Sequence, residues 1–77
     1  MIPNKKNKEW GDLIKNKIKP DLKSYSLKMQ LNSIRQLYRF GKLSIDEAVN
    51  DLYDHCLKYE KIYTEDIKSI FNSKVTA

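Results

Sequence analysis

His55 and Cys56 are the side chains whose types could do chemistry, because a thiol beside an imidazole can act as a nucleophile with its base. The chain contains one histidine and one cysteine in all. They lie in a segment with helical spacing, where successive side chains diverge by about 100°. Cys56 then falls in the middle of the apolar face and His55 at its flank. We therefore expect a core cysteine, a boundary histidine and no catalytic residue.

Metal and phosphate chemistry lack their usual residues. A structural zinc site takes about four nitrogen or sulfur ligands, and the chain offers only this one pair. Phosphate-cradling loops are rich in glycine, and only Gly11 and Gly41 are present. We expect no metal, no cofactor and no enzyme activity.

Basic side chains form the first candidate site. Lys28, Arg35 and Arg39 share one side of a helix predicted over about 25–40. Three lysines share the outer side of a helix predicted over about 8–18, namely Lys8, Lys15 and Lys19. Such stripes could track a phosphate backbone, and the alternative is a solvated face.

Acidic and aromatic side chains form two further candidates. Glu47, Asp51 and Asp54 share the outer face of a helix predicted over about 44–60, and they suit either a basic partner or ordinary solubility. Spare aromatic side chains favour protein contacts or base stacking, although on so short a chain they could equally cover the core. The aromatic candidates are Trp10, Tyr25, Phe40 and Tyr63.

Charge is unevenly divided along the chain. Residues 1–40 carry ten lysines and arginines against three carboxylates, a net charge of +7. Residues 41–77 carry five lysines against seven carboxylates, a net charge of −2. This asymmetry favours a polyanion, a membrane surface or a protein surface of both signs as partner, unless it arose by chance.

The predicted elements are all helices. Apolar residues recur at helical spacing, Gly41 suits a left-handed helix terminator, and Ser44 with Glu47 has the spacing of a capping box. Pro20 is expected to end the first helix, and Thr64 to cap the last. The predicted order is a flexible basic arm over 1–7, helices over about 8–18, 25–40, 44–60 and 64–71, and a frayed tail over 72–77. The fold class is all-α: one small domain of three to four helices over 1–77, built around an antiparallel hairpin.

A glycine in the short turn of this hairpin is also found in DNA-reading helix-turn-helix units. There the second helix approaches the major groove with its N-terminal residues. Here those residues include Asp46, Glu47 and Asp51, which would be repelled by phosphates. We therefore predict a hairpin that closes a core.

These observations predict a small non-enzymatic interaction protein, such as an inhibitor, adaptor or accessory regulator, that binds another protein. The alternative is a nucleic-acid-binding protein that uses its basic N-terminal half with low sequence specificity. Self-association of the basic face with the acidic face and membrane binding through the first helix are further alternatives. Whether that helix packs on the hairpin is left open. Abundant lysine, isoleucine, asparagine and tyrosine are typical of AT-rich genomes, such as that of a low-GC bacterium or its phage, and small regulators of this kind are encoded by phages and mobile elements. The lone cysteine, with no signal peptide and no long apolar run, favours a cytoplasmic protein.

Overall fold

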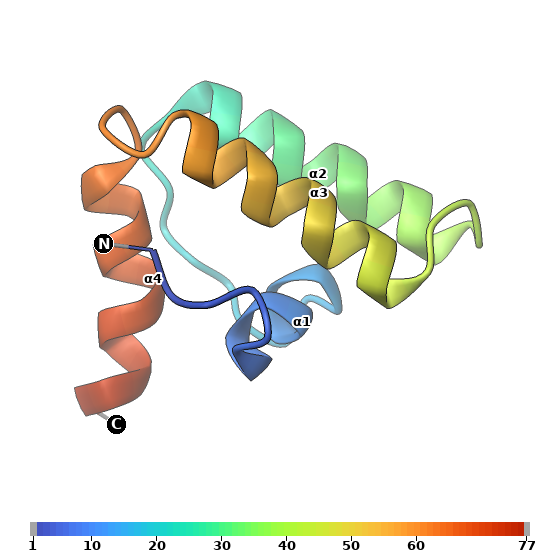
Figure 1. The fold of residues 1–77 in the computed structure, drawn as a ribbon, viewed down its shortest axis with the longest axis horizontal. Helices are drawn as coiled ribbons and strands as arrows, with labels where there is room; N and C mark the ends of the chain where they lie inside the picture. The colour runs from blue at the N-terminus through green and yellow to red at the C-terminus, as the bar shows by residue number, and fades with distance from the viewer. Residues whose placement is uncertain (1, 77) are drawn as a thin grey trace.

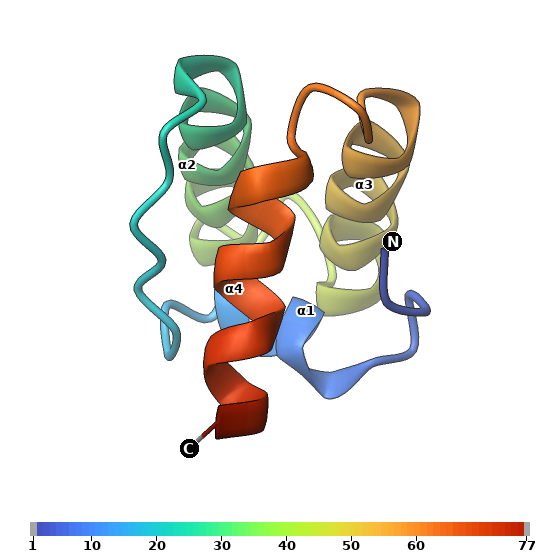
Figure 2. The same ribbon diagram turned by 90° about the vertical axis from the view of Figure 1, so that its left-hand side faces the viewer.

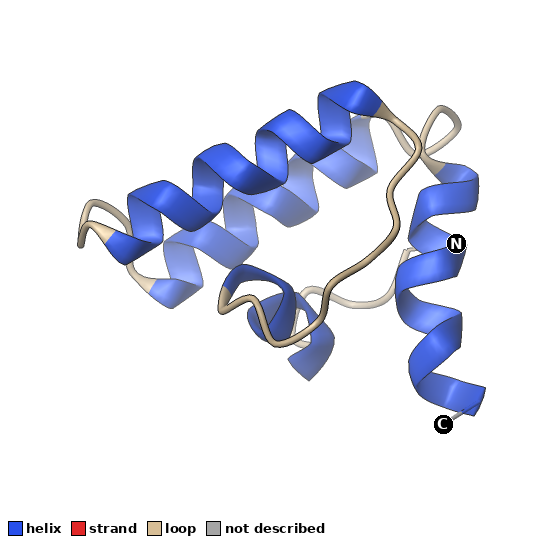
Figure 3. Cartoon of the chain, turned by 180° about the vertical axis from the view of Figure 1, so that it is seen from behind, coloured by secondary structure: helices blue, strands red, loops and turns tan. Residues whose placement is uncertain are grey.

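Four α-helices occur in the computed structural model, which describes residues 2–76, with side chains through Phe71 (Figures 1 and 3). No strand occurs among these described residues, and the prediction of an all-α fold is confirmed. In the same range, no helix has both the length and the apolar character needed to cross a bilayer. The helices are α1 (Lys8–Ile14), α2 (Tyr25–Arg39), α3 (Ile45–Lys58) and α4 (Thr64–Thr76).

The α2–α3 pair is an antiparallel hairpin, as predicted (Figure 1). Its turn depends on Gly41, whose φ of 76° lies in the left-handed region. The amides of Gly41 and Lys42 donate to the carbonyls of Tyr38 and Leu37, at 3.1 and 2.8 Å. This pairing is the Schellman motif that satisfies the last carbonyls of a helix.

The start of α3 carries the predicted capping box. The amide of Glu47 donates to Ser44 Oγ at 3.1 Å, and the amide of Ser44 donates to Glu47 Oε1 at 2.9 Å. Both bonds satisfy amides that the first turn of a helix leaves without partners. The register of the hairpin is therefore set by residues close to the turn itself.

The end of α1 was predicted wrongly. The helix stops at Ile14 rather than near 18, because Asn16 adopts a left-handed φ of 62°. The amides of Asn16 and Lys17 donate to the carbonyls of Leu13 and Asp12, at 3.1 and 2.8 Å. Asparagine tolerates this conformation, so a Schellman turn ends the helix well before Pro20.

α1 packs against the hairpin, which answers the question the sequence left open. Trp10 is 1% exposed and packs against Tyr53 of α3 and Phe71 of α4, with ring centroids 5.6 and 4.8 Å apart. Its indole Nε1 donates to the carbonyl of Asn4 at 3.0 Å. One side chain therefore ties the N-terminal arm and α1 to the rest of the core.

α4 lies across the end of the hairpin where α2 begins and α3 ends (Figure 2). Ile67, Ile70 and Phe71 are buried in the core. The helix continues through Thr76, beyond the predicted 64–71, and the side chains of the predicted frayed tail lie outside the described residues. Thr64 does not cap the helix: its hydroxyl donates back to the carbonyl of Glu60 at 2.9 Å.

Asp66 is a buried carboxylate, 3% exposed, in the first turn of α4. Its two oxygens accept from the amides of Lys23 and Ser24, at 2.9 and 2.8 Å. Burial alone would raise the pKa of Asp66, but these hydrogen bonds and the Lys23 charge outweigh burial and lower it. Asp66 therefore fastens the 15–24 connector to α4.

Candidate interaction surface

Cys56 lies in the core, as predicted, and its thiol is not available as a nucleophile. Burial raises the pKa of Cys56 to about 12, so the thiol stays protonated at neutral pH. His55 Nε2 instead lies 2.8 Å from the Tyr63 hydroxyl, which lies 2.7 Å from Ser26 Oγ. Burial and nearby Lys58 lower the pKa of His55. This chain of hydrogen bonds joins α2, α3 and the loop before α4.

In the part of the chain that the structure describes, no group of three or more His, Cys, Asp or Glu side chains is placed to hold a metal ion.

Arg35 is part of the fold rather than a free member of the basic stripe. Its Nε donates to the carbonyl of Leu13 at 2.9 Å, and its Nη2 donates to that of Ile18 at 3.1 Å. Burial and the nearby charge of Arg39 lower the pKa of Arg35, yet a guanidinium stays charged at neutral pH. The predicted stripe on α2 therefore keeps Lys28 and Arg39 as its exposed members.

The predicted lysine stripe on the first helix does not exist as one helical face. α1 ends before Lys15, which is its C-cap, and Lys19 lies in the connector. Lys19 instead meets Lys28 and Arg35 around a hollow of about 220 Å³ between the connector and α2. Its other lining residues are Pro20, Leu22, Leu31 and Asn32.

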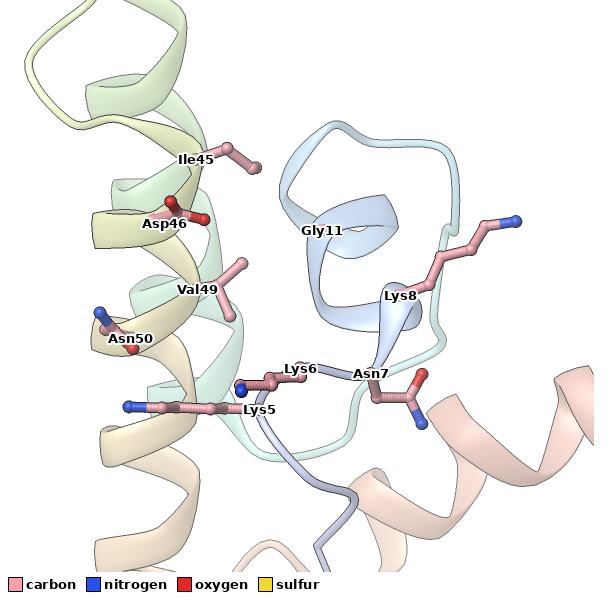
Figure 4. A pocket seen from close by; sticks show the side chains of 9 residues that line it. All are labelled: Lys5, Lys6, Asn7, Lys8, Gly11, Ile45, Asp46, Val49 and Asn50. Atoms are coloured by element: carbon pink, nitrogen blue, oxygen red, sulfur yellow. The ribbon is translucent and has the colours of Figure 1, made fainter.

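A larger open groove of about 540 Å³ separates the N-terminal arm and α1 from α3 (Figure 4). Ile45 and Val49 point from α3 toward α1, and Lys5 and Lys6 border the groove from the arm (Figure 4). The side chain of Lys8 points away from α3 (Figure 4). The six lysines and arginines of the predicted basic site are therefore divided between separate places.

The aromatic candidates fall into two groups. Trp10 and Tyr63 are 1% and 2% exposed, so their prediction as surface contacts was wrong: other helices cover them. Tyr25 and Phe40 are 73% and 71% exposed. They remain available for contact with another molecule.

Tyr25 and Phe40 belong to a longer exposed line along α2 that the sequence analysis missed. Met29 is 52% and Leu37 39% exposed. At about 100° per residue, these four residues, together with Ser33 and Gln36, occupy about 120° of the circumference of α2, on the side opposite Leu31 and Tyr38. The angular spacing alone could have revealed it. We call this set the outer stripe, and its members are Tyr25, Met29, Ser33, Gln36, Leu37 and Phe40.

The two edges of the outer stripe carry opposite charges. Lys28 and Arg39 lie within about 40° of Arg35 around α2, so they share the edge that faces α1 and the connector. The other edge adjoins α3, which exposes the predicted acidic residues. The Glu47 carboxylate is engaged in the capping box, whereas the carboxylates of Asp51 and Asp54 make no hydrogen bond or ion pair with other described residues. Lys58, also exposed, lies at a similar angle around α3 to these three carboxylates, so the order across the hairpin is basic, apolar and net acidic.

Comparison of this chain with protein-family models, curated proteins and solved structures found no match.

Proposed function

We propose that this protein is a non-enzymatic binding module that acts by contacting another protein chain through the outer stripe of α2. The observation that carries the proposal is the exposure of Tyr25, Met29, Leu37 and Phe40 along one line of one helix. Large apolar side chains that gather on a surface are typical of protein interfaces, and aromatic residues are frequent among the strongest contacts.

The charged edges restrict the partner. A complementary surface needs an apolar strip with carboxylates beside Lys28 and Arg39, and cations beside Asp51 and Asp54. Such complementarity acts mainly on specificity and on the rate of association. The surface therefore suits a partner of both charge signs better than a uniformly acidic or basic one.

The test is photo-crosslinking from Gln36, which is exposed in the middle of the outer stripe, in cells that encode the protein. We expect a photoreactive side chain at Gln36 to form a discrete protein adduct that Met29→Lys removes. The matched control carries the same group at Lys68, an exposed position on α4, and should not form that adduct. No adduct from Gln36, or an adduct that persists in Met29→Lys, would overturn the proposal.

The hollow between the connector and α2 favours a second candidate function, the binding of nucleic acid. Lys19, Lys28 and Arg35 converge there, and the described residues place no carboxylate in its lining. Phosphate contacts make affinity fall steeply as salt rises. Fluorescence anisotropy with duplex DNA and single-stranded RNA should show salt-dependent binding that Lys19→Glu with Lys28→Glu weakens, and no binding at low salt would reject this function.

A further inference from the structure

We infer that the partner of the outer stripe is a second copy of this chain, packed with α2 alongside α2 in the same direction about a two-fold axis parallel to the helices. This inference rests on the proposed function, because it names the occupant of the same surface. The apolar side chains suit a contact between two copies of α2, and the placement of the charged side chains selects the parallel arrangement.

The apolar side chains lie at both ends of α2, so they suit contact between two copies of this helix in either direction. Tyr25 and Met29 lie at the start of α2, Leu37 and Phe40 lie at its end, and Ser33 lies between them. In a parallel pair, each apolar end covers the same end of the other copy. The smaller side chain near the middle lets the two helices approach within the usual 8–10 Å or so between axes.

The charges select between the two possible symmetries. A two-fold axis perpendicular to α2 makes the helices antiparallel and places each edge of the outer stripe against the same edge of the other copy. Lys28 of one copy would then lie opposite Arg39 of the other, which is repulsive. A two-fold axis parallel to α2 places the basic edge of one copy against the acidic edge of the other, so only the parallel dimer is complementary.

Basic residues of α2 and acidic residues of α3 also lie at similar heights along the axis of the hairpin. Arg39 ends α2 and Glu47 is two residues past the start of α3, so in an antiparallel hairpin they lie at levels about 3 Å apart. Lys28 is eleven residues before Arg39, and Asp54 is nine residues after Ile45, which again leaves a difference of about 3 Å. The parallel two-fold keeps these levels, and it brings Lys28 toward Asp54 of the other copy.

Symmetric disulfide formation in the purified full chain tests this arrangement. Met29 and Gln36 lie on the same side of α2, seven residues apart. In a parallel dimer, every stripe residue meets its own equivalent, so Met29→Cys and Gln36→Cys should each form a disulfide-linked dimer under mild oxidation. In an antiparallel dimer at most one of these positions lies on the two-fold axis, and a disulfide needs Cα atoms within about 7 Å. Buried Cys56 keeps the background low.

The control for chance collisions is Leu57→Cys, which is exposed on α3 outside the outer stripe and should not cross-link. Sedimentation equilibrium of the unmodified chain should show a monomer–dimer equilibrium. Lys28→Glu should raise the dissociation constant of the dimer by roughly tenfold, because the two symmetry-related pairs of Lys28 and Asp54 become repulsive. Lys28→Glu combined with Asp54→Lys should restore the affinity of the dimer.

Three results would overturn the inference: a monomer at all concentrations, cross-linking at only one of the two cysteine positions, or no rescue by the double exchange. If the purified chain is monomeric while Gln36 still captures a different protein in cells, the dimer fails and the proposed function stands. If neither occurs, both fail.

Discussion

Arg35 joins the end of α1 to the connector that follows it. Its guanidinium donates to the carbonyls of Leu13 and Ile18 on either side of the left-handed turn that ends α1. Hydrogen bonds from a charged donor contribute about 1.5–3 kcal/mol each. Arg35 is only partly buried, so water can replace part of each bond, and Arg35→Ala should lower the free energy of unfolding by about 2–3 kcal/mol, measured by urea denaturation.

The matched control is Arg39→Ala on the same side of α2. Arg39 is exposed, so its replacement should change the free energy of unfolding by less than about 0.5 kcal/mol. Equal effects of the two substitutions would contradict a structural role for Arg35.

His55 and Asp66 should make the protein less stable in acid, in two steps. Both have a pKa lowered by folding, so the unfolded chain binds their protons more tightly. The contribution of His55 is present above its unfolded pKa of about 6.5 and is lost as the pH falls through its folded pKa. The contribution of Asp66 is present above about pH 3.9 and is lost as the pH falls further.

Urea denaturation at a series of pH values from about 8 to about 2 measures this dependence. Asp66→Asn should be less stable than the unmodified chain at neutral pH, because an amide cannot offer two accepting oxygens to Lys23 and Ser24. Its stability should also change less below about pH 4. An unchanged slope in that range would show that Asp66 does not carry the acid-sensitive contribution.

At the scale of elements, α1 is short and contains an internal glycine. A Cβ added at Gly11 would meet no atom within 4 Å, so alanine fits without displacement. Alanine also reduces the freedom of the unfolded chain. Gly11→Ala should therefore raise the free energy of unfolding by roughly 0.5–1 kcal/mol, measured by chemical denaturation.

Gly41→Ala is the contrasting substitution. The added Cβ again meets nothing within 4 Å, but the left-handed φ of 76° penalises any side chain. We expect a loss of about 1–2 kcal/mol. A loss in Gly11→Ala as well would mean that the conformation of α1 differs from an ordinary helix.

At the scale of the whole molecule, Trp10 connects α1, α3 and α4 in one core. Replacing a buried tryptophan by alanine costs about 3–5 kcal/mol. A domain of this length has a total stability of about 4–12 kcal/mol. Trp10→Ala should therefore lower the thermal midpoint of the whole helical signal in circular dichroism, and Trp10→Phe should recover part of the loss. A hairpin that melts as before would contradict a single cooperative core.

Local sequence determined the helical class, the positions of α2 and α3, the Gly41 turn and the capping box. Each of these depends on apolar spacing or on hydrogen bonds between residues a few positions apart. The end of α1 was also decided locally, by Asn16, although the prediction had placed it near the proline four residues later.

Only the tertiary structure decided which side chains serve the core and which remain on the surface. Trp10 and Phe40 are both aromatic, yet α3 and α4 cover the first and nothing in the described chain covers the second. Asp66 reaches amides 42 and 43 positions away, and Arg35 reaches carbonyls 17 and 22 positions away. Such contacts depend on how helices dock, because a residue's helical angle specifies its direction but not what it meets there.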